Sequence, residues 1–160
     1  MSTRGAVGII CNGIEKVGYN HCDSYPEGLG NEMIEFLKHM NNVRLKEIFD
    51  KISFNEDSKP MDVWNWKKHT FNENFADSSD FLADSLFCEW AYIINLDTKM
   101  LEFYQGFNND EKANGRYANK GKYECSNGTV YYGVSLKKEI PLISFYHGKM
   151  KIVDDNFEEK

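Results

Sequence analysis

The sequence predicts an α+β fold, an antiparallel or mixed sheet built from hairpins with helices packed on one face. Stretches rich in β-branched and aromatic residues lie near both ends of the chain and are separated by turn signals. Between them, apolar residues recur at helical spacing over residues 31–52. The regular alternation of strands and helices that is typical of a doubly wound parallel sheet is missing.

The chain opens with a predicted β-hairpin. Residues 4–11 and 14–20 are strand-like, and Asn12-Gly13 between them is the strongest two-residue turn signal. Asn and Gly tolerate the positive φ values that a type I′ turn requires. A polar loop over residues 21–30 follows this hairpin.

Helices are predicted after this loop. Residues 33–40 and 45–52 each place apolar side chains on one helical face. Residues 61–77 predict a short helix followed by irregular chain. Residues 78–86 predict another short helix, capped at its start by Ser and Asp.

The second half of the chain predicts mostly sheet. Residues 88–105 form a second hairpin around a polar turn, and residues 122–140 form a third. Residues 107–121, which are polar and rich in Gly and Asn, predict a long mobile loop. Pro141 ends the last long strand, and residues 143–153 add a short strand or a helical turn.

Length and composition indicate one domain. A chain of 160 residues with 41% hydrophobic residues suits a single ordinary core. We therefore expect one α+β domain over residues 1–153. Residues 154–160 are acidic and predict a flexible tail.

Several classes of function are disfavoured by composition. A net charge of -6 lacks the basic face that extended nucleic acid requires. No apolar run approaches the roughly 20 residues that span a bilayer, and the start of the chain lacks a signal-peptide pattern, so we expect no membrane contact and a cytoplasmic location. The four cysteines are scattered and no metal-ligand spacing occurs, which predicts free thiols, no metal and no cofactor.

The strongest candidate site is the segment of residues 19–30. It places His21, Asp23, Ser24 and Tyr25 between a strand end and a helix start, where binding groups often lie. The helix start offers free N–H groups for an anion. With Arg4, these four residues are the predicted ligand-binding set of this segment. The alternative is that they only shape a turn.

A second candidate pair lies in the long loop. Arg116 and Tyr117 combine a phosphate-binding side chain with an aromatic face that could stack a base. A loop of this composition could close over a ligand as a lid.

A catalytic interpretation centres on the N-terminus. Ser2, exposed after removal of Met1, or Thr3 could attack a carbonyl with its own amine as base, assisted by His21 and Asp23. The layout resembles N-terminal-nucleophile hydrolases of the bile-salt-hydrolase type, in which an Asp near the end of the second strand lies beside the nucleophile. The leading Cys of those enzymes is missing here.

The chain also resembles a poorly characterised family of short proteins from phages, bacteria, some fungi and large viruses. Members open with MSTR or MGTRG and carry a motif close to YNHxDSYPxGLG. The matching residues are Thr3-Arg4-Gly5, Gly8, Tyr19-Asn20-His21, Asp23-Ser24-Tyr25-Pro26 and Gly28-Leu29-Gly30, with a looser match at Glu89-Trp90-Ala91-Tyr92. The resemblance implies a shared fold and a phage or mobile-element context, hence the host cytoplasm, but no activity.

Three functions stay open at this point. The first is capture of a small nucleotide-like ligand, antagonising host defence. The second is amide hydrolysis by an N-terminal nucleophile. The third is inhibition of a host protein through the acidic surface. The sequence decides neither whether the protein is an enzyme nor its oligomeric state.

Overall fold

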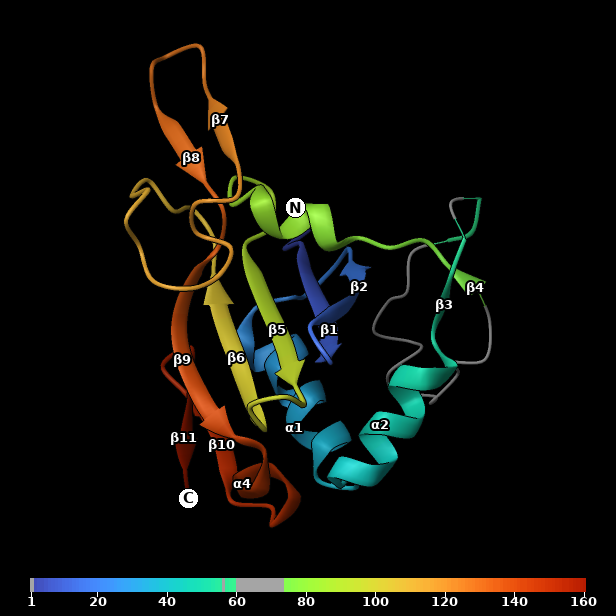
Figure 1. The fold of residues 1–160 in the computed structure, drawn as a ribbon. Helices are drawn as coiled ribbons and strands as arrows, with labels where there is room; N and C mark the ends of the chain where they lie inside the picture. Colours follow the sequence, from blue (N-terminus) through green and yellow to red (C-terminus); the bar gives the residue numbers. More distant parts are fainter. Residues whose placement is uncertain (1, 56, 60–73) are drawn as a thin grey trace.

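The computed structural model describes residues 2–55, 57–59 and 74–160 (Figure 1). Its centre is a five-stranded mixed sheet with the order β2-β1-β5-β6-β9. The strands are β1 (Gly5–Cys11), β2 (Ile14–Asn20), β5 (Trp90–Asn95), β6 (Met100–Gln105) and β9 (Ser135–Pro141). β1 pairs with β5 in parallel, and the other neighbours pair antiparallel. The predicted α+β class is confirmed.

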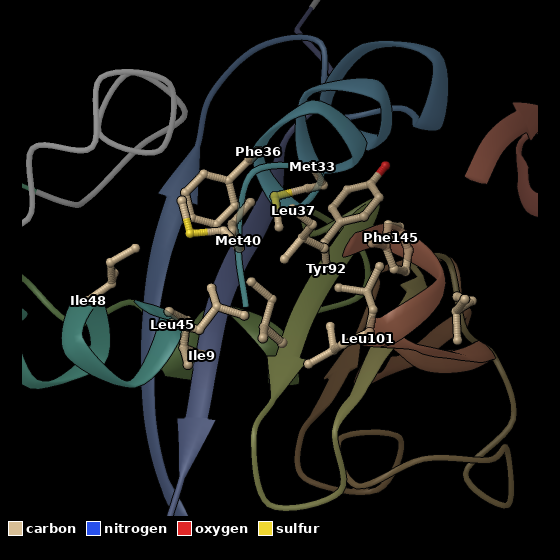
Figure 2. Close-up of a cluster of buried hydrophobic side chains, with 14 of the residues drawn as sticks. Ile9, Met33, Phe36, Leu37, Met40, Leu45, Ile48, Tyr92, Leu101 and Phe145 are labelled. Atoms are coloured by element: carbon tan, nitrogen blue, oxygen red, sulfur yellow. The ribbon is translucent and has the colours of Figure 1, made fainter. Parts of the chain in front are cut away.

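Helices pack on one face of this sheet, as predicted. They are α1 (Asn31–Leu37), α2 (Asn42–Lys51) and α4 (Leu142–Tyr146). One buried cluster joins them to the sheet (Figure 2). Its members include Ile9, Tyr92 and Leu101 from the strands and Met33, Leu45 and Phe145 from the helices. Burial of these apolar side chains is what holds the helices on the sheet.

Shorter elements connect these layers. They are the π-helix η1 (Pro26–Gly30), the 3-10 helix η2 (Ser79–Ala83), and three two-stranded pairs: β3 (Ser53–Phe54) with β4 (Asn74–Phe75), β7 (Lys122–Glu124) with β8 (Val130–Tyr132), and β10 (Met150–Val153) with β11 (Asn156–Glu159). The predicted third hairpin is therefore divided, since β7 and β8 form it while β9 joins the main sheet. The helix predicted within residues 61–77 lies largely outside the described residues.

The first hairpin has the predicted turn. Asn12 and Gly13 have φ values of 53° and 74°. The Asp97 carboxylate accepts hydrogen bonds from both of their N–H groups, at 2.7 and 2.9 Å. The turn between β1 and β2 is thus fastened to the turn between β5 and β6.

The other face of the sheet is covered by irregular chain. A second buried cluster on this face contains Ala6, Ile10, Ala91, Ile93 and Tyr104 from the strands and Leu82, Tyr117 and Val134 from the covering segments. The long loop of residues 107–121 therefore lies against the sheet. Tyr117 from this loop is only 2% exposed.

The C-terminal residues correct the expectation of a flexible tail. Residues 154–155 make a turn, and β11 pairs antiparallel with β10. Phe157 is fully buried, and its ring contacts Tyr92, Phe103 and Phe145. Fully burying a Phe stabilises a fold by about 1.5–3 kcal/mol. This burial holds the end of the chain on the core, although the acidic composition predicts a free end.

Replacing Phe157 by Ala should lower the free energy of unfolding by about 3–5 kcal/mol, because it removes a ring from a closed aromatic cluster. Urea denaturation followed by tryptophan fluorescence measures the change. The matched control is Glu158→Ala, an exposed position on the same strand. Equal denaturation midpoints for the two variants would show that β11 contributes nothing to the core.

Candidate functional site

The loop after β2 is a tight turn that leads into η1. Asp23 has a positive φ of 55°, which Asp tolerates better than most residues. Its carbonyl oxygen accepts from Leu29 N at 2.9 Å, and the Tyr25 carbonyl accepts from Gly28 N at 2.9 Å. A Cβ at Gly28 would collide with the Asp23 carbonyl oxygen. The backbone of this motif therefore serves the turn itself.

Ser24 is the anchor of the loop. It is fully buried, and its N–H donates to the Thr3 carbonyl at 3.1 Å. Its Oγ accepts from Asn20 Nδ2 at 2.8 Å, and its carbonyl accepts from the Tyr92 hydroxyl at 2.7 Å. The loop thus lies directly beside the N-terminal residues, as the sequence predicts. Ser24 itself is occupied by internal bonds.

The strand register explains how the predicted site residues divide. Gly5 pairs with Asn20 on β2 and with Trp90 on β5. The next row therefore sets Arg4 between His21 and Glu89, with side chains on one face because opposite residues share a face. By alternation this is the face of Ala6. Ser24 packs on the other face, where a Cβ on Gly5 would meet it.

Arg4 is the unusual member of this row. Its guanidinium makes no hydrogen bond or ion pair with any described residue, and its Nε is buried without a partner. Its Cζ lies 5.8 Å from the ring centroid of Phe87, which is 45% exposed. Its backbone is fixed to Glu89, whose N–H donates to the Arg4 carbonyl at 3.0 Å and whose Oε2 accepts from Arg4 N at 3.2 Å.

His21 is exposed and held by a neighbour. Its Nδ1 lies 2.8 Å from the Tyr19 hydroxyl, and the Tyr19 ring packs edge-on against Phe81. If Tyr19 donates this bond, the neutral imidazole carries its proton on Nε2 and can donate to a ligand. Asp23 and Tyr25 are also exposed, and the Tyr25 side chain is 39% accessible.

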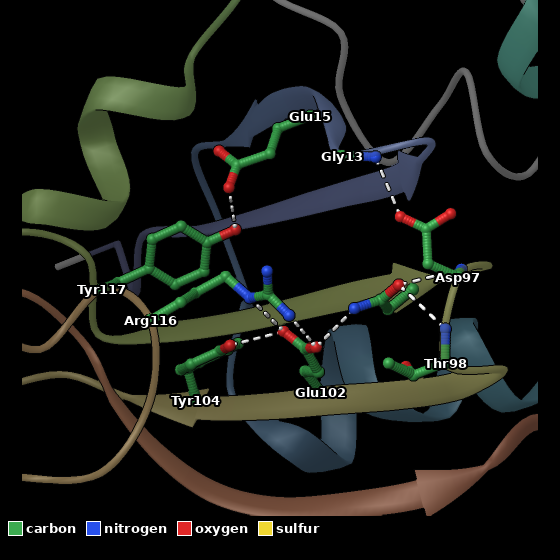
Figure 3. A network of polar contacts seen from close by, with 9 residues as sticks. Gly13, Glu15, Asp97, Thr98, Glu102, Tyr104, Arg116 and Tyr117 are labelled. Atoms are coloured by element: carbon green, nitrogen blue, oxygen red, sulfur yellow. Dashed lines mark hydrogen bonds and ion pairs between the residues drawn. The ribbon is translucent and has the colours of Figure 1, made fainter.

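Arg116 and Tyr117 bind the protein's own carboxylates (Figure 3). Arg116 donates from Nε and Nη2 to the two oxygens of Glu102, at 3.0 and 2.6 Å. Glu102 also accepts from Tyr104 and Asn95, at 2.5 and 2.8 Å. The Tyr117 hydroxyl donates to Glu15 at 3.1 Å. Both predicted ligand residues thus fasten the long loop to the sheet in this structure.

Glu102 is the charged centre of this network and is 3% exposed. Burial by itself would raise the pKa of its carboxyl group. The hydrogen bonds from Arg116, Tyr104 and Asn95 outweigh burial, so the pKa is lowered. Burial, followed by the contact with Glu102, raises the pKa of Tyr104, and burial with the charge of Glu15 raises that of Tyr117. Glu102 therefore stays ionised and the two tyrosines neutral near pH 7.

Other features of the described residues do not add to the Arg4 row. A hollow of about 390 Å³ is lined by Glu111, Asn119, Lys120, Gly121, Lys122 and Tyr132, none of them a predicted site residue. Over the ranges that the structure describes, no group of three or more His, Cys, Asp or Glu side chains could hold a metal ion. Within the same ranges, no helix has the length and apolar character to cross a membrane.

Comparisons with known proteins give no relative. No protein-family model, no curated protein and no solved structure matches the chain.

Sequence reasoning misses Phe87 and Glu89 as site residues. They lie more than eighty positions from Arg4 and reach it through the parallel pairing of β1 with β5. Short-range patterns carry no signal for such a pairing. The one available hint is that Glu89 opens the looser of the two stretches that resemble the phage family.

Glu102→Gln should weaken the fold in a pH-dependent way. The folded pKa of Glu102 lies below its ordinary value of 4.5, so the ionised group stabilises the fold above that pH and loses this effect as the pH falls. We expect the variant to be about 1–3 kcal/mol less stable at pH 7, with the difference shrinking below about pH 4.5. Urea denaturation between pH 7 and pH 3 measures it.

The control for this experiment is Glu124→Gln, which changes the same charge at an exposed position of β7. Its free energy of unfolding should equal that of the wild-type protein at every pH. A constant difference between Glu102→Gln and wild type over the whole range would contradict the proposed role of the Glu102 charge.

Proposed function

We propose that the protein binds a small anionic, nucleotide-like ligand at the end of the sheet around Arg4. The observation that carries this proposal is the guanidinium of Arg4, which has no hydrogen bond or ion pair with the residues that the structure describes and whose Nε is buried. A buried donor without a partner costs about 1–3 kcal/mol. Because Nε is closed off from solvent, a phosphate or carboxylate would bind the terminal nitrogens of the guanidinium through charge-assisted hydrogen bonds.

The neighbours of Arg4 restrict its guanidinium and add a second polar group to the row. The ring of Phe87 lies against the guanidinium and limits where this side chain can move. The row continues to His21, whose Nε2 can donate a second hydrogen bond to an anion when the Tyr19 hydroxyl donates to Nδ1. A net charge of -6 makes a single anionic ligand a better candidate than extended nucleic acid.

The biological part of the proposal rests on the resemblance to phage proteins. In a phage or mobile-element context, a protein that captures a nucleotide-like signalling molecule would lower its free concentration in the host cell. Such a protein needs no catalytic group and no cofactor. The row offers one cation and aromatic rings, with the Glu89 carboxylate bonded to the Arg4 backbone.

Arg4→Gln should weaken binding of phosphate-bearing ligands about tenfold or more, since hydrogen bonds between charged groups contribute about 1.5–3 kcal/mol. Isothermal titration calorimetry with AMP, ADP-ribose and cyclic mononucleotides measures the affinities. Raising the salt concentration should weaken the binding of the same ligands to the wild-type protein. Adenosine, which has no phosphate, should bind wild type and variant equally.

The matched control is Arg44→Gln, which removes the same charge from an exposed position of helix α2. It should bind every ligand as wild type does. If no phosphate-bearing ligand binds wild type, or if Arg4→Gln and Arg44→Gln bind alike, the proposed site is wrong.

One contact favours amide hydrolysis as a second candidate function. Ser2 Oγ lies 3.5 Å from Cys22 Sγ, so the second residue of the chain lies against the predicted site loop. Once Met1 is removed, the Ser2 hydroxyl could attack an amide carbonyl while its own amine takes the proton. The C–N bond of the amide would then break as the N-terminal amine passes this proton to the leaving amine, and water would hydrolyse the remaining Ser2 ester to release the acid and restore the hydroxyl.

This second function requires a free N-terminal Ser2. Intact-mass spectrometry should show loss of Met1, and a β-lactone probe should add its mass to wild type but not to Ser2→Ala. A chain that keeps Met1, or a Ser2→Ala variant that is labelled as fully as wild type, would rule out this nucleophile.

A further inference from the structure

Phe107 has two unfavourable features, a strained backbone and an exposed aromatic ring, that packing does not explain. Its φ is 53°, in the left-handed region that a bulky side chain rarely occupies. Its ring is also 50% exposed, so burial does not offset the strain. Gly or Asn would suit this backbone better. Backbone strain of this kind concentrates at ligand-binding sites.

The surrounding backbone holds Phe107 in this conformation. Its N–H donates to the Ser85 carbonyl at 2.6 Å, and the N–H of Asn108 donates to Ser85 Oγ at 3.0 Å. Just before it, a Cβ on Gly106 would collide with the Cys88 carbonyl oxygen. The Phe107 ring lies edge-on to Tyr131, with 6.5 Å between centroids. The backbone of Phe107 is therefore held by hydrogen bonds, and its ring contacts Tyr131 on one edge.

The strand register places Gly106, the residue before Phe107, in the same row as Arg4. Gly106 N donates to the Glu89 carbonyl at 2.8 Å, so Gly106 continues the row of Arg4 and Glu89 onto β6. Neighbouring strands lie about 4.8 Å apart, so Arg4 and Gly106 are separated by roughly 10 Å. That distance is comparable to the length of a nucleoside monophosphate from phosphate to base.

Phe87 is a poorer platform for a base. Its ring already carries the Arg4 guanidinium at 5.8 Å. A phosphate held by Arg4 would lie beside this ring, and the base of the same nucleotide must lie further away. Phe107, which directly follows Gly106, is a half-exposed aromatic residue.

We infer that Phe107 stacks the base of a nucleoside monophosphate whose phosphate binds Arg4. This inference rests on the proposed function and deepens it by naming the ligand class and the second contact. The hydrogen-bonded backbone and the contact with Tyr131 restrict the ring before the ligand arrives, which lowers the side-chain entropy that binding loses. Stacking accepts any base, and a purine offers the larger face.

The test separates the two ends of the ligand. AMP has a phosphate and a base, ribose 5-phosphate lacks the base, and adenosine lacks the phosphate. Calorimetry with the full chain measures all three against wild type, Phe107→Gly, Phe107→Asn and Phe107→Trp. The matched control is Tyr123→Leu, which replaces another aromatic residue that is 50% exposed.

Phe107→Gly and Phe107→Asn should keep or raise the Tm, because both residues accept a positive φ. They should bind AMP about tenfold or more weakly and ribose 5-phosphate unchanged. Phe107→Trp should keep AMP affinity, as should Tyr123→Leu. Loss of affinity without loss of stability is the result that a structural role of Phe107 cannot produce.

Two results would overturn the inference alone. One is unchanged AMP binding by Phe107→Gly while Arg4→Gln still weakens it. The other is a lower Tm for both Phe107→Gly and Phe107→Asn, which would make the ring a structural element. If wild type binds neither AMP nor ribose 5-phosphate, the proposed function fails together with the inference.

Discussion

The parallel pairing of β1 with β5 is the interaction on which the rest of this structure depends. It joins a hairpin at the start of the chain to a hairpin more than eighty residues later, and so makes one sheet from two. The helices between them then have one continuous apolar face to cover. The same pairing sets Arg4 beside Glu89, and its continuation onto β6 reaches Gly106. The core and the candidate site thus both depend on the pairing of β1 with β5.

Most of the fold follows from local patterns. The Asn12-Gly13 turn, the helical spacing before residue 52 and the hairpin around residue 97 are each decided by neighbours in sequence. The prediction of a flexible tail was wrong because Phe157, one apolar residue among acidic ones, packs into the core. The residues that it contacts there lie outside any short stretch of sequence around it. The role of Arg116 depends in the same way on Glu102, a single charge within an apolar strand. Long-range partners are what the sequence could not supply.

The candidate site shows the same division. The position of the loop after β2, beside the N-terminus, was predictable, since a hairpin returns the chain to its start. Which residues share a face was not, because the chain turns sharply after His21. Ser24 then faces the helices, while Arg4 and His21 face the other side. The motif of residues 19–30 therefore separates into a turn that builds the fold and a short row that carries the proposed binding site.

Charge constrains how such a row can act. The protein carries a net charge of -6, so its overall field repels an anion rather than attracting it. Affinity for an anion must then come from short-range contacts, where a partly buried cation is less screened by salt than an exposed one. Contacts of this kind act mainly on the dissociation rate. They are also strongest when the groups are fixed in advance, which gives a physical reason to keep both an unpaired arginine and a strained aromatic residue at one end of the sheet.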